Sequence, residues 1–154
     1  MASNTRAILS AVATRLAAIN GTGVYVNDLS ASGRVRIGSP GIADGTTPPC
    51  AWVGVGTLNS EHGPQLGRYK RVLVLDIEAR VGADGTPDAR ALAAADLLDD
   101  LCATLESDRT LGGTVLDVIV TGASFAGDEY GIPGCAIAMA SATVYWHAIS
   151  GAGV

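Results

Sequence analysis

The clearest alternation of apolar and polar residues lies in Arg68–Val81. Its odd-numbered positions are apolar except for Arg71, whereas its even-numbered positions are polar at both ends and hold Val72 and Val74 in the middle. A period of two predicts a β-strand with one face in the core. Val72 and Val74 further predict that the other face is partly covered, by a second layer or by a neighbouring subunit.

A helical period follows in Pro87–Asp108. Thr86 is placed to cap this helix, and Pro87 occupies its first turn, where a missing N–H costs nothing. The predicted core stripe comprises Ala91, Ala94, Ala95, Leu98, Leu101, Cys102 and Leu105, and the predicted outer face holds Asp96, Asp99, Asp100 and Glu106. The alanines indicate close approach to a sheet. A matching row of small residues lies in the last predicted strand, at Ala136, Ala138, Ala140 and Ala142.

Weaker patterns complete the chain. A first helix is predicted from a cap at Ser3 or Asn4 to about Ile19, where Asn20-Gly21 ends it. Further strands are predicted over Val24–Asn27, Arg34–Ile37, Cys50–Val55, Thr114–Thr121 and Cys135–His147. Loops are predicted over Ser39–Pro49, Gly56–Gly67 and Gly122–Gly134, with a frayed C-terminus at residues 150–154. The prediction is one α+β domain over residues 1–154, with a single mainly antiparallel sheet, an Ala-rich helix packed on one face and a short N-terminal helix.

Composition and charge point to an ordered protein that contacts neighbours. The 154 residues are 48% hydrophobic and only 16% charged, which favours a folded chain whose surface is partly covered in an oligomer. The net charge of −5 argues against coating nucleic acid. Residues 1–83 hold eight basic and five acidic side chains, whereas residues 84–154 hold two and ten. Two readings stay open: an acidic solvated helix face, or opposite faces of one subunit meeting head to tail in a ring.

The cysteines and the termini exclude several classes of protein. Cys50, Cys102 and Cys135 form no CxxC or Cys/His cluster, so each is interpreted as a small buried hydrophobe, as fits a reducing cytoplasm. The N-terminus lacks the layout of a signal peptide, and no window approaches 18 uninterrupted apolar residues. A membrane span is therefore not expected.

A search for catalytic groups finds no constellation. His62 falls in a predicted flexible loop and His147 ends a predicted strand, so neither has the packed setting that a general base needs. The glycines of Gly54-Val55-Gly56 lack the GxGxxG spacing of a nucleotide site. Trp52, Tyr69 and Tyr145 are interpreted as core anchors, and Trp146 as a core or an interface residue.

The paired carboxylates do not change this picture. Asp99 and Asp100 are adjacent on a helix and point in different directions. Asp128-Glu129 is interpreted as a solvated loop rather than a cation site, and Asp76 and Glu78 are expected to pair with basic residues on neighbouring strands. The sequence therefore predicts no catalytic residue, no cofactor site and no metal site.

The order of elements resembles that of the tail-terminator, or tail-completion, proteins of tailed bacteriophages. The residues that carry the resemblance are Arg71–Glu78, Ala91–Leu101, Ala136–Trp146 and the N-terminal helix around Arg6–Leu16. The resemblance covers most of the chain. It lies in the order and spacing of the elements, because the family has no invariant short motif.

The resemblance implies a structural virion protein rather than an enzyme. Such a protein forms a ring, commonly a homohexamer, on the last ring of tail-tube protein; it ends tube polymerisation and presents the joining surface for the head or neck. The implied partners are a second copy of the chain, the tail-tube protein and a head-closure or neck protein, with DNA at most passing through the ring. The implied location is the head-proximal end of the virion tail, after assembly in the host cytoplasm. A head-closure or neck connector ring is the first alternative, and a small-molecule binding module or enzyme is the second.

Overall fold

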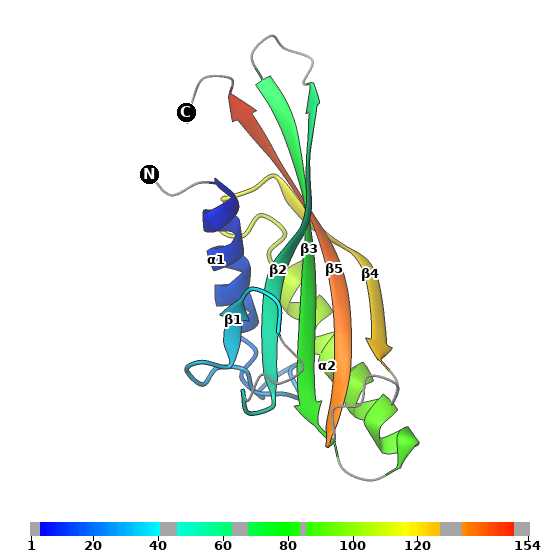
Figure 1. Cartoon of the computed structure of the whole chain (residues 1–154). Coiled ribbons are helices and arrows are strands. Elements are labelled where there is room, and N and C mark those ends of the chain that lie inside the picture. Colours follow the sequence, from blue (N-terminus) through cyan, green and yellow to red (C-terminus); the bar gives the residue numbers. More distant parts are fainter. Residues whose placement is uncertain (1–3, 41–45, 63–67, 84–85, 127–133, 150–154) are drawn as a thin grey trace.

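A computed structural model describes residues 4–40, 46–62, 68–83, 86–126 and 134–149. Its elements, in chain order, are α1 (Asn4–Leu16), β1 (Val35–Ile37), β2 (Cys50–His62), β3 (Arg68–Gly82), α2 (Pro87–Glu106), β4 (Asp117–Ala126) and β5 (Cys135–Ile149). Figure 1 shows long, twisted strands flanked by the two helices. The α+β class, the N-terminal helix and the second helix on the sheet are as predicted.

The five strands form one sheet in the order β1-β2-β3-β5-β4. Three of the four pairings are antiparallel, and only β1 runs parallel to its neighbour β2. The long central pair runs in unbroken register from Arg68 opposite Ile149 to Gly82 opposite Cys135. Strands β3 and β5 therefore form the rigid centre of the molecule.

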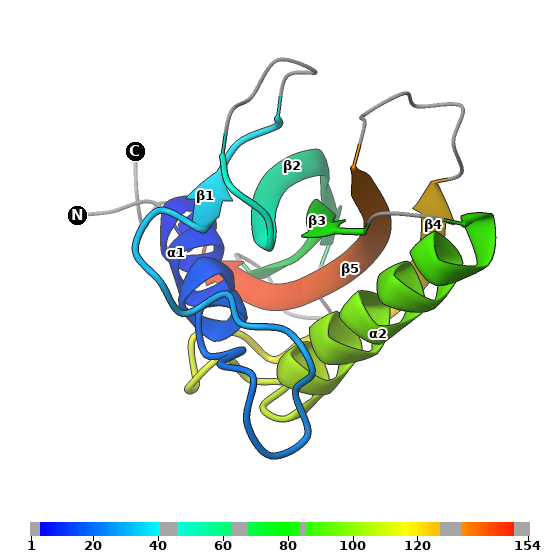
Figure 2. The ribbon, with the colours of Figure 1, turned by 90° about the horizontal axis from the view of Figure 1, so that it is seen from below.

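Both helices lie on the same side of this curled sheet. In Figure 2, β5 bows around with α2 on its outer side, and α1 lies beside β1. The core between these layers takes alternate residues of each strand, as the alternation in β3 predicts. Its fully buried members include Leu73 and Leu75 of β3, and Val12 and Leu16 of α1. The predicted row of small residues in β5, from Ala136 to Ala142, is buried too.

Helix α1 ends three residues earlier than predicted. After Leu16 the chain tightens, because the Ala18 and Ile19 amides donate to carbonyls three residues back, at 3.0 and 3.2 Å. This turn still buries Ile19, whose carbonyl accepts a 2.7 Å hydrogen bond from the Leu29 amide. The buried side of α1, which holds Ile8, Val12 and Leu16, is therefore continued by Ile19 beyond the end of the helix.

The predicted strand over Val24–Asn27 does not form. The amides of Val26 and Asn27 donate to the carboxylate of Asp100 on α2, at 3.0 and 2.8 Å, and the Asn27 side chain adds a third bond at 2.8 Å. These donors are used by a side chain and not by a neighbouring strand. The predicted strand over Arg34–Ile37 is confirmed as a short edge strand, β1.

Strand β2 is longer than the predicted Cys50–Val55. It continues to His62, so most of the predicted loop Gly56–Gly67 is a strand, and residues 63–67 lie outside the described part. A β-bulge between Val55 and Thr57 shifts the register, after which the strand pairs with β3 up to His62 opposite Tyr69. The second half of this strand contains a glycine and polar residues, so the sequence does not indicate a strand there. Pairing with the apolar strand β3 stabilises it. Of the predicted loop Ser39–Pro49, residues 41–45 are likewise not described.

Helix α2 has the predicted cap but a different buried face. The Thr86 hydroxyl accepts a hydrogen bond from the Ala89 amide at 3.3 Å, and Pro87 begins the helix. The buried residues are Ala94, Leu97, Asp100, Leu101, Thr104 and Leu105. The predicted stripe was therefore rotated: Ala91 is exposed, Leu98 and Cys102 are half-buried, and Asp100 points inward instead of outward. The hydrogen bonds that Asp100 accepts explain how a carboxylate is buried there.

Strand β4 begins three residues later than the predicted Thr114–Thr121 and continues to Ala126. Residues before it are held in turns, and the Leu116 amide donates to the Tyr145 carbonyl at 2.8 Å just before β4 begins. A second register shift lies between Val120 and Gly122. The strand then continues to Ala126, so residues 122–126 of the predicted loop Gly122–Gly134 form a strand. Strand β5 likewise extends beyond His147 to Ile149. The predicted carboxylate pair Asp128-Glu129 and the C-terminal residues 150–154 lie outside the described residues.

Candidate functional site

A hollow of about 420 Å³ lies on the sheet face opposite the helices. We call this surface the far face. Two neighbouring rows of the sheet form its floor: Trp52, Glu78, Met139 and Ser124 in one row, and Asp76 and Ser141 in the next. Residues 38–40 form one wall, close to Gly54. A side chain at Gly54 would meet the Gly38 carbonyl and the Ser39 hydroxyl at 3.4 Å, so glycine lets this segment approach the strand.

An arginine and a tryptophan are buried together beside this hollow. The Arg80 guanidinium lies over the Trp52 ring, 4.7 Å from its centroid. Its Nε donates to Glu78 Oε1 at 2.9 Å, and its Nη2 forms an ion pair with the same oxygen, also at 2.9 Å. The expected ion pair of Glu78 is therefore with its own strand and not with a neighbouring one. Trp52 is buried as predicted, but on the far face and not in the core between the layers. The cation–π contact and the ion pair together fix the polar edge of the hollow.

The distal ends of β2, β3 and β5 extend beyond both helices (Figure 1). We call this part the arm and define it as Asn59–His62, Arg68–Val72 and Tyr145–Ile149. Lys70 links its three strands on one face, because its Nζ lies 3.9 Å from Glu61 Oε2 and 4.8 Å from the Tyr145 ring centroid. On the other face Arg71 donates to the Ser60 hydroxyl. Tyr69 and Tyr145 are half-buried here, so they do not anchor the core as predicted, whereas Trp146 is buried in it.

Both sides of the sheet have open strand edges in the described part of the chain. Strand β1 pairs only with Ala51–Val53, so β2 has no strand on its outer side from Gly54 onward. Strand β4 has β5 on one side and no strand on the other. Val55 and Leu58 on β2 and Ile119 on β4 are exposed at these edges. An open edge with exposed apolar side chains is a surface that favours pairing with another chain.

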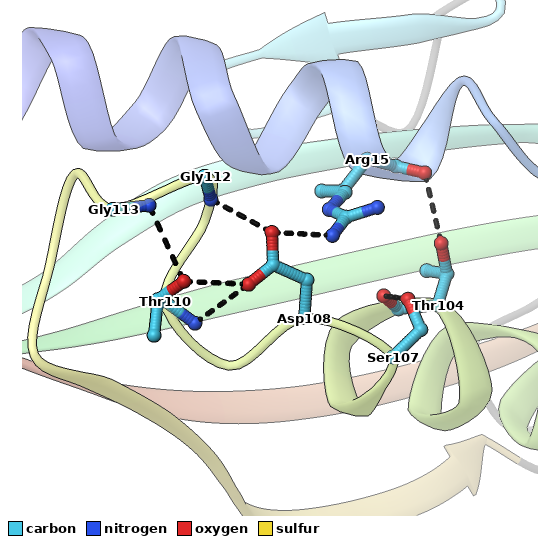
Figure 3. Close-up of polar contacts among 7 residues, drawn as sticks. All are labelled: Arg15, Thr104, Ser107, Asp108, Thr110, Gly112 and Gly113. Atoms are coloured by element: carbon cyan, nitrogen blue, oxygen red, sulfur yellow. Dashed lines mark hydrogen bonds and ion pairs between the residues drawn. The ribbon is translucent and has the colours of Figure 1, made fainter.

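A polar cluster fixes the segment after α2 against α1 (Figure 3). The Asp108 carboxylate accepts hydrogen bonds from the amides of Thr110 and Gly112, at 3.0 and 2.7 Å, and from the Thr110 hydroxyl at 2.7 Å; it also pairs with Arg15 at 2.6 Å. The Thr104 hydroxyl donates to the Arg15 carbonyl at 3.0 Å. These donors lower the pKa of Asp108 to about 2, and the hydrogen bond from the Thr110 hydroxyl has the largest effect. The cluster has a structural role, because its polar groups satisfy one another.

The remaining titratable candidates form no catalytic arrangement within the described residues. His62 is the last residue of β2, and His147 is exposed near the end of β5. Cys50 is buried, while Cys102 and Cys135 are half-buried, so only one of the three is fully buried as expected. Burial, followed by the nearby charges of Glu106 and Asp99, raises the pKa of the Cys102 thiol, which lowers its reactivity.

The described part of the chain contains neither a group of metal ligands nor a membrane-spanning helix. No three His, Cys, Asp or Glu side chains there are grouped so that they would hold a metal ion. No helix of these residues has both the length and the apolar content to cross a membrane. Comparison with known proteins adds no assignment, because no family model and no curated protein matches the sequence.

Proposed function

We propose that this chain is a structural protein of a tailed bacteriophage. It forms a ring, commonly a homohexamer, on the head-proximal end of the tail tube, where it ends tube polymerisation and presents the joining surface for the head or neck. Its partners in this role are further copies of itself, the tail-tube protein and a head-closure or neck protein. The role is one of assembly and involves no catalysis.

The open, apolar edges of the sheet are the observation that carries this proposal. Val55 and Leu58 on one edge and Ile119 on the other are exposed beside strand edges that no other described strand pairs with. Such edges are normally blunted or covered in proteins that act alone. Two different edges on one subunit favour heterologous contacts, and heterologous contacts that close generate a ring. The arm supplies a second surface, which reaches beyond the helix layer towards other proteins (Figure 1).

The order of elements supports the particular kind of ring. A helix, a short strand, two long strands, a long Ala-rich helix and two further strands follow one another as in the resemblance to tail terminators. The Ala-rich surface of β5 and the buried face of α2 pack against each other, as the alanines of both elements predict.

The test has two stages. Light scattering after size exclusion, followed by negative-stain imaging, is expected to find rings with an open centre. The purified chain is then added to growing tubes of the tail-tube protein from the same phage, and tube lengths are measured. Shorter tubes with a ring at one end are the expected result. Tubes of unchanged length with no ring bound would contradict the proposed function.

Two observations define the alternatives. A head-closure or neck ring would also use the open edges, but it would bind an already terminated tail and leave tube length unchanged. The hollow of about 420 Å³, which has the exposed carboxylate of Asp76 in its floor, favours a binding module for a small cationic ligand. A monomer whose melting temperature rises with such a ligand would support this second alternative.

A further inference from the structure

The solvent-facing side of α2 combines four carboxylates with one large apolar side chain. Asp88, Asp96, Asp99 and Glu106 are all exposed, and Leu92 among them is 68% exposed. Their spacing along the helix places all five side chains on one face. Within the described part of the chain, none of the four carboxylates forms an ion pair. We call these five residues the acidic stripe.

The acidic stripe destabilises the isolated chain. Asp96 and Asp99 are three residues apart, so their like charges repel each other. Asp99 and Glu106 lie in the C-terminal half of α2, where the helix dipole favours cations, and the last turn contains no basic residue. A cationic partner on this face would relieve both effects.

The edge of the sheet that lies farthest from α2, formed by β1 and β2, carries an apolar strip with a basic end. Ile37, Val55 and Leu58 are 53%, 48% and 46% exposed. The strand register places them on the helix-covered face, in successive positions along the open edge of β1 and β2. Arg71 lies on the same face, one position beyond Leu58 and hydrogen-bonded to Ser60. We call Ile37, Val55, Leu58 and Arg71 the edge patch.

We infer that the acidic stripe of one copy docks on the edge patch of the next copy. This inference rests on the proposed ring and assigns its subunit contact. Leu92 would supply the apolar anchor for Val55 and Leu58. The described residues 4–62 hold four basic and two acidic side chains, whereas 86–126 hold two and seven, so the two sides of the subunit are complementary in charge.

The geometry of the two surfaces fits this contact. From Asp88 to Glu106 the stripe spans about 27 Å at 1.5 Å per helical residue. The edge patch spans about 20 Å at 3.3 Å per strand residue. The helix α2 packs on β4 and β5, while β1 and β2 form the other end of the sheet, so the two surfaces lie on opposite sides (Figure 2). Contacts between opposite sides are heterologous, as a ring requires.

A mixing experiment tests the contact. Leu92→Lys disables the stripe, and Leu58→Glu disables the edge patch. Val24→Lys and Val24→Glu are matched controls, because Val24 is also an exposed aliphatic residue but lies on neither surface. By light scattering, each disabled variant alone should have the 15.5 kDa mass of one chain, and both controls should assemble like the parent. An equimolar mixture of the two disabled variants should give twice the mass of one chain, since each retains one intact surface.

A second variant separates assembly from folding. The double substitution Asp96→Asn with Asp99→Asn removes the repulsion in α2 and takes one negative charge from the C-terminal half of the helix, so the melting temperature of the subunit should rise while assembly weakens at least tenfold. Higher salt should also weaken assembly of the parent chain.

The outcomes distinguish this contact from the proposed function. Rings that cap tubes but persist in Leu92→Lys and Leu58→Glu would overturn the contact and leave the function standing. A parent chain that stays monomeric at all concentrations would overturn the contact, as would a mixture that stays monomeric. Assembly through the predicted contact without any effect on tube length would retain the contact and refute the function.

Discussion

Replacing Asp100 by alanine tests how the segment after α1 is held on α2. The Asp100 side chain is only 2% exposed and accepts three hydrogen bonds at 2.8–3.0 Å from Val26 and Asn27. Hydrogen bonds to a charged group contribute about 1.5–3 kcal/mol each. Because Val26 lies at the surface, water replaces part of this loss. We therefore expect a decrease of about 3 kcal/mol in the free energy of unfolding, less than the full sum.

For a chain of this size, each kcal/mol lowers the melting temperature by about 2–4 °C, so the decrease corresponds to roughly 6–12 °C. Circular dichroism during urea and thermal unfolding measures both quantities. Asp99→Ala is the matched control, since Asp99 is the exposed neighbour on the same helix, and its effect should stay within about 0.5 kcal/mol. Equal stability of Asp100→Ala and Asp99→Ala would refute the assignment of Asp100 as the residue that holds this segment.

Three further predictions concern the polar cluster, the packed layer and a turn. Because Asp108 has a pKa of about 2 in the folded chain against an ordinary 3.8, the unfolded chain binds the proton first; stability from this group is present above about pH 4 and is lost towards pH 2. Asp108→Asn should lack this part of the pH dependence in urea midpoints measured from pH 2 to 5, and identical profiles would exclude the cluster as its source. Ala140→Leu should overpack the layer beneath α2 and lower the free energy of unfolding by about 1–3 kcal/mol, whereas Ala123→Leu at an exposed position should change it little. Gly113→Ala should cost about 1–2 kcal/mol at a φ of 83°, and Gly82→Ala, with open space around it and no positive φ, should cost less; equal effects would contradict the conformational argument.

The sequence predicts best where one local rule decides the structure. Strong alternation marks β3, and the hydroxyl of Thr86 followed by Pro87 marks the start of α2; both are confirmed. The row of alanines in β5 is also a local pattern. It predicts close contact with a helix, and these alanines are buried as that contact requires.

The errors share a physical cause, which is a partner far away in the chain. The buried carboxylate of Asp100 depends on donors 73 and 74 residues away, so nothing near it in the sequence indicates burial. The same hydrogen bonds prevent a strand at Val24–Asn27. The polar half of β2 forms because β3 pairs with it, and the hollow on the far face exists because three strands bring Trp52, Asp76 and Ser141 together.

The central position of β5 has a consequence for how the chain folds. This strand follows the other four described strands in the sequence, yet it lies between β3 and β4, and in the described structure it is the only strand that pairs with β4. During synthesis β4 therefore has no strand to pair with until β5 is made, and the three strands β1, β2 and β3 are the largest part of the sheet that can form earlier. Strand pairs as distant as Arg68 and Ile149 raise the contact order and slow folding. The open edge of β3 is thus exposed on the nascent chain until the final strand arrives.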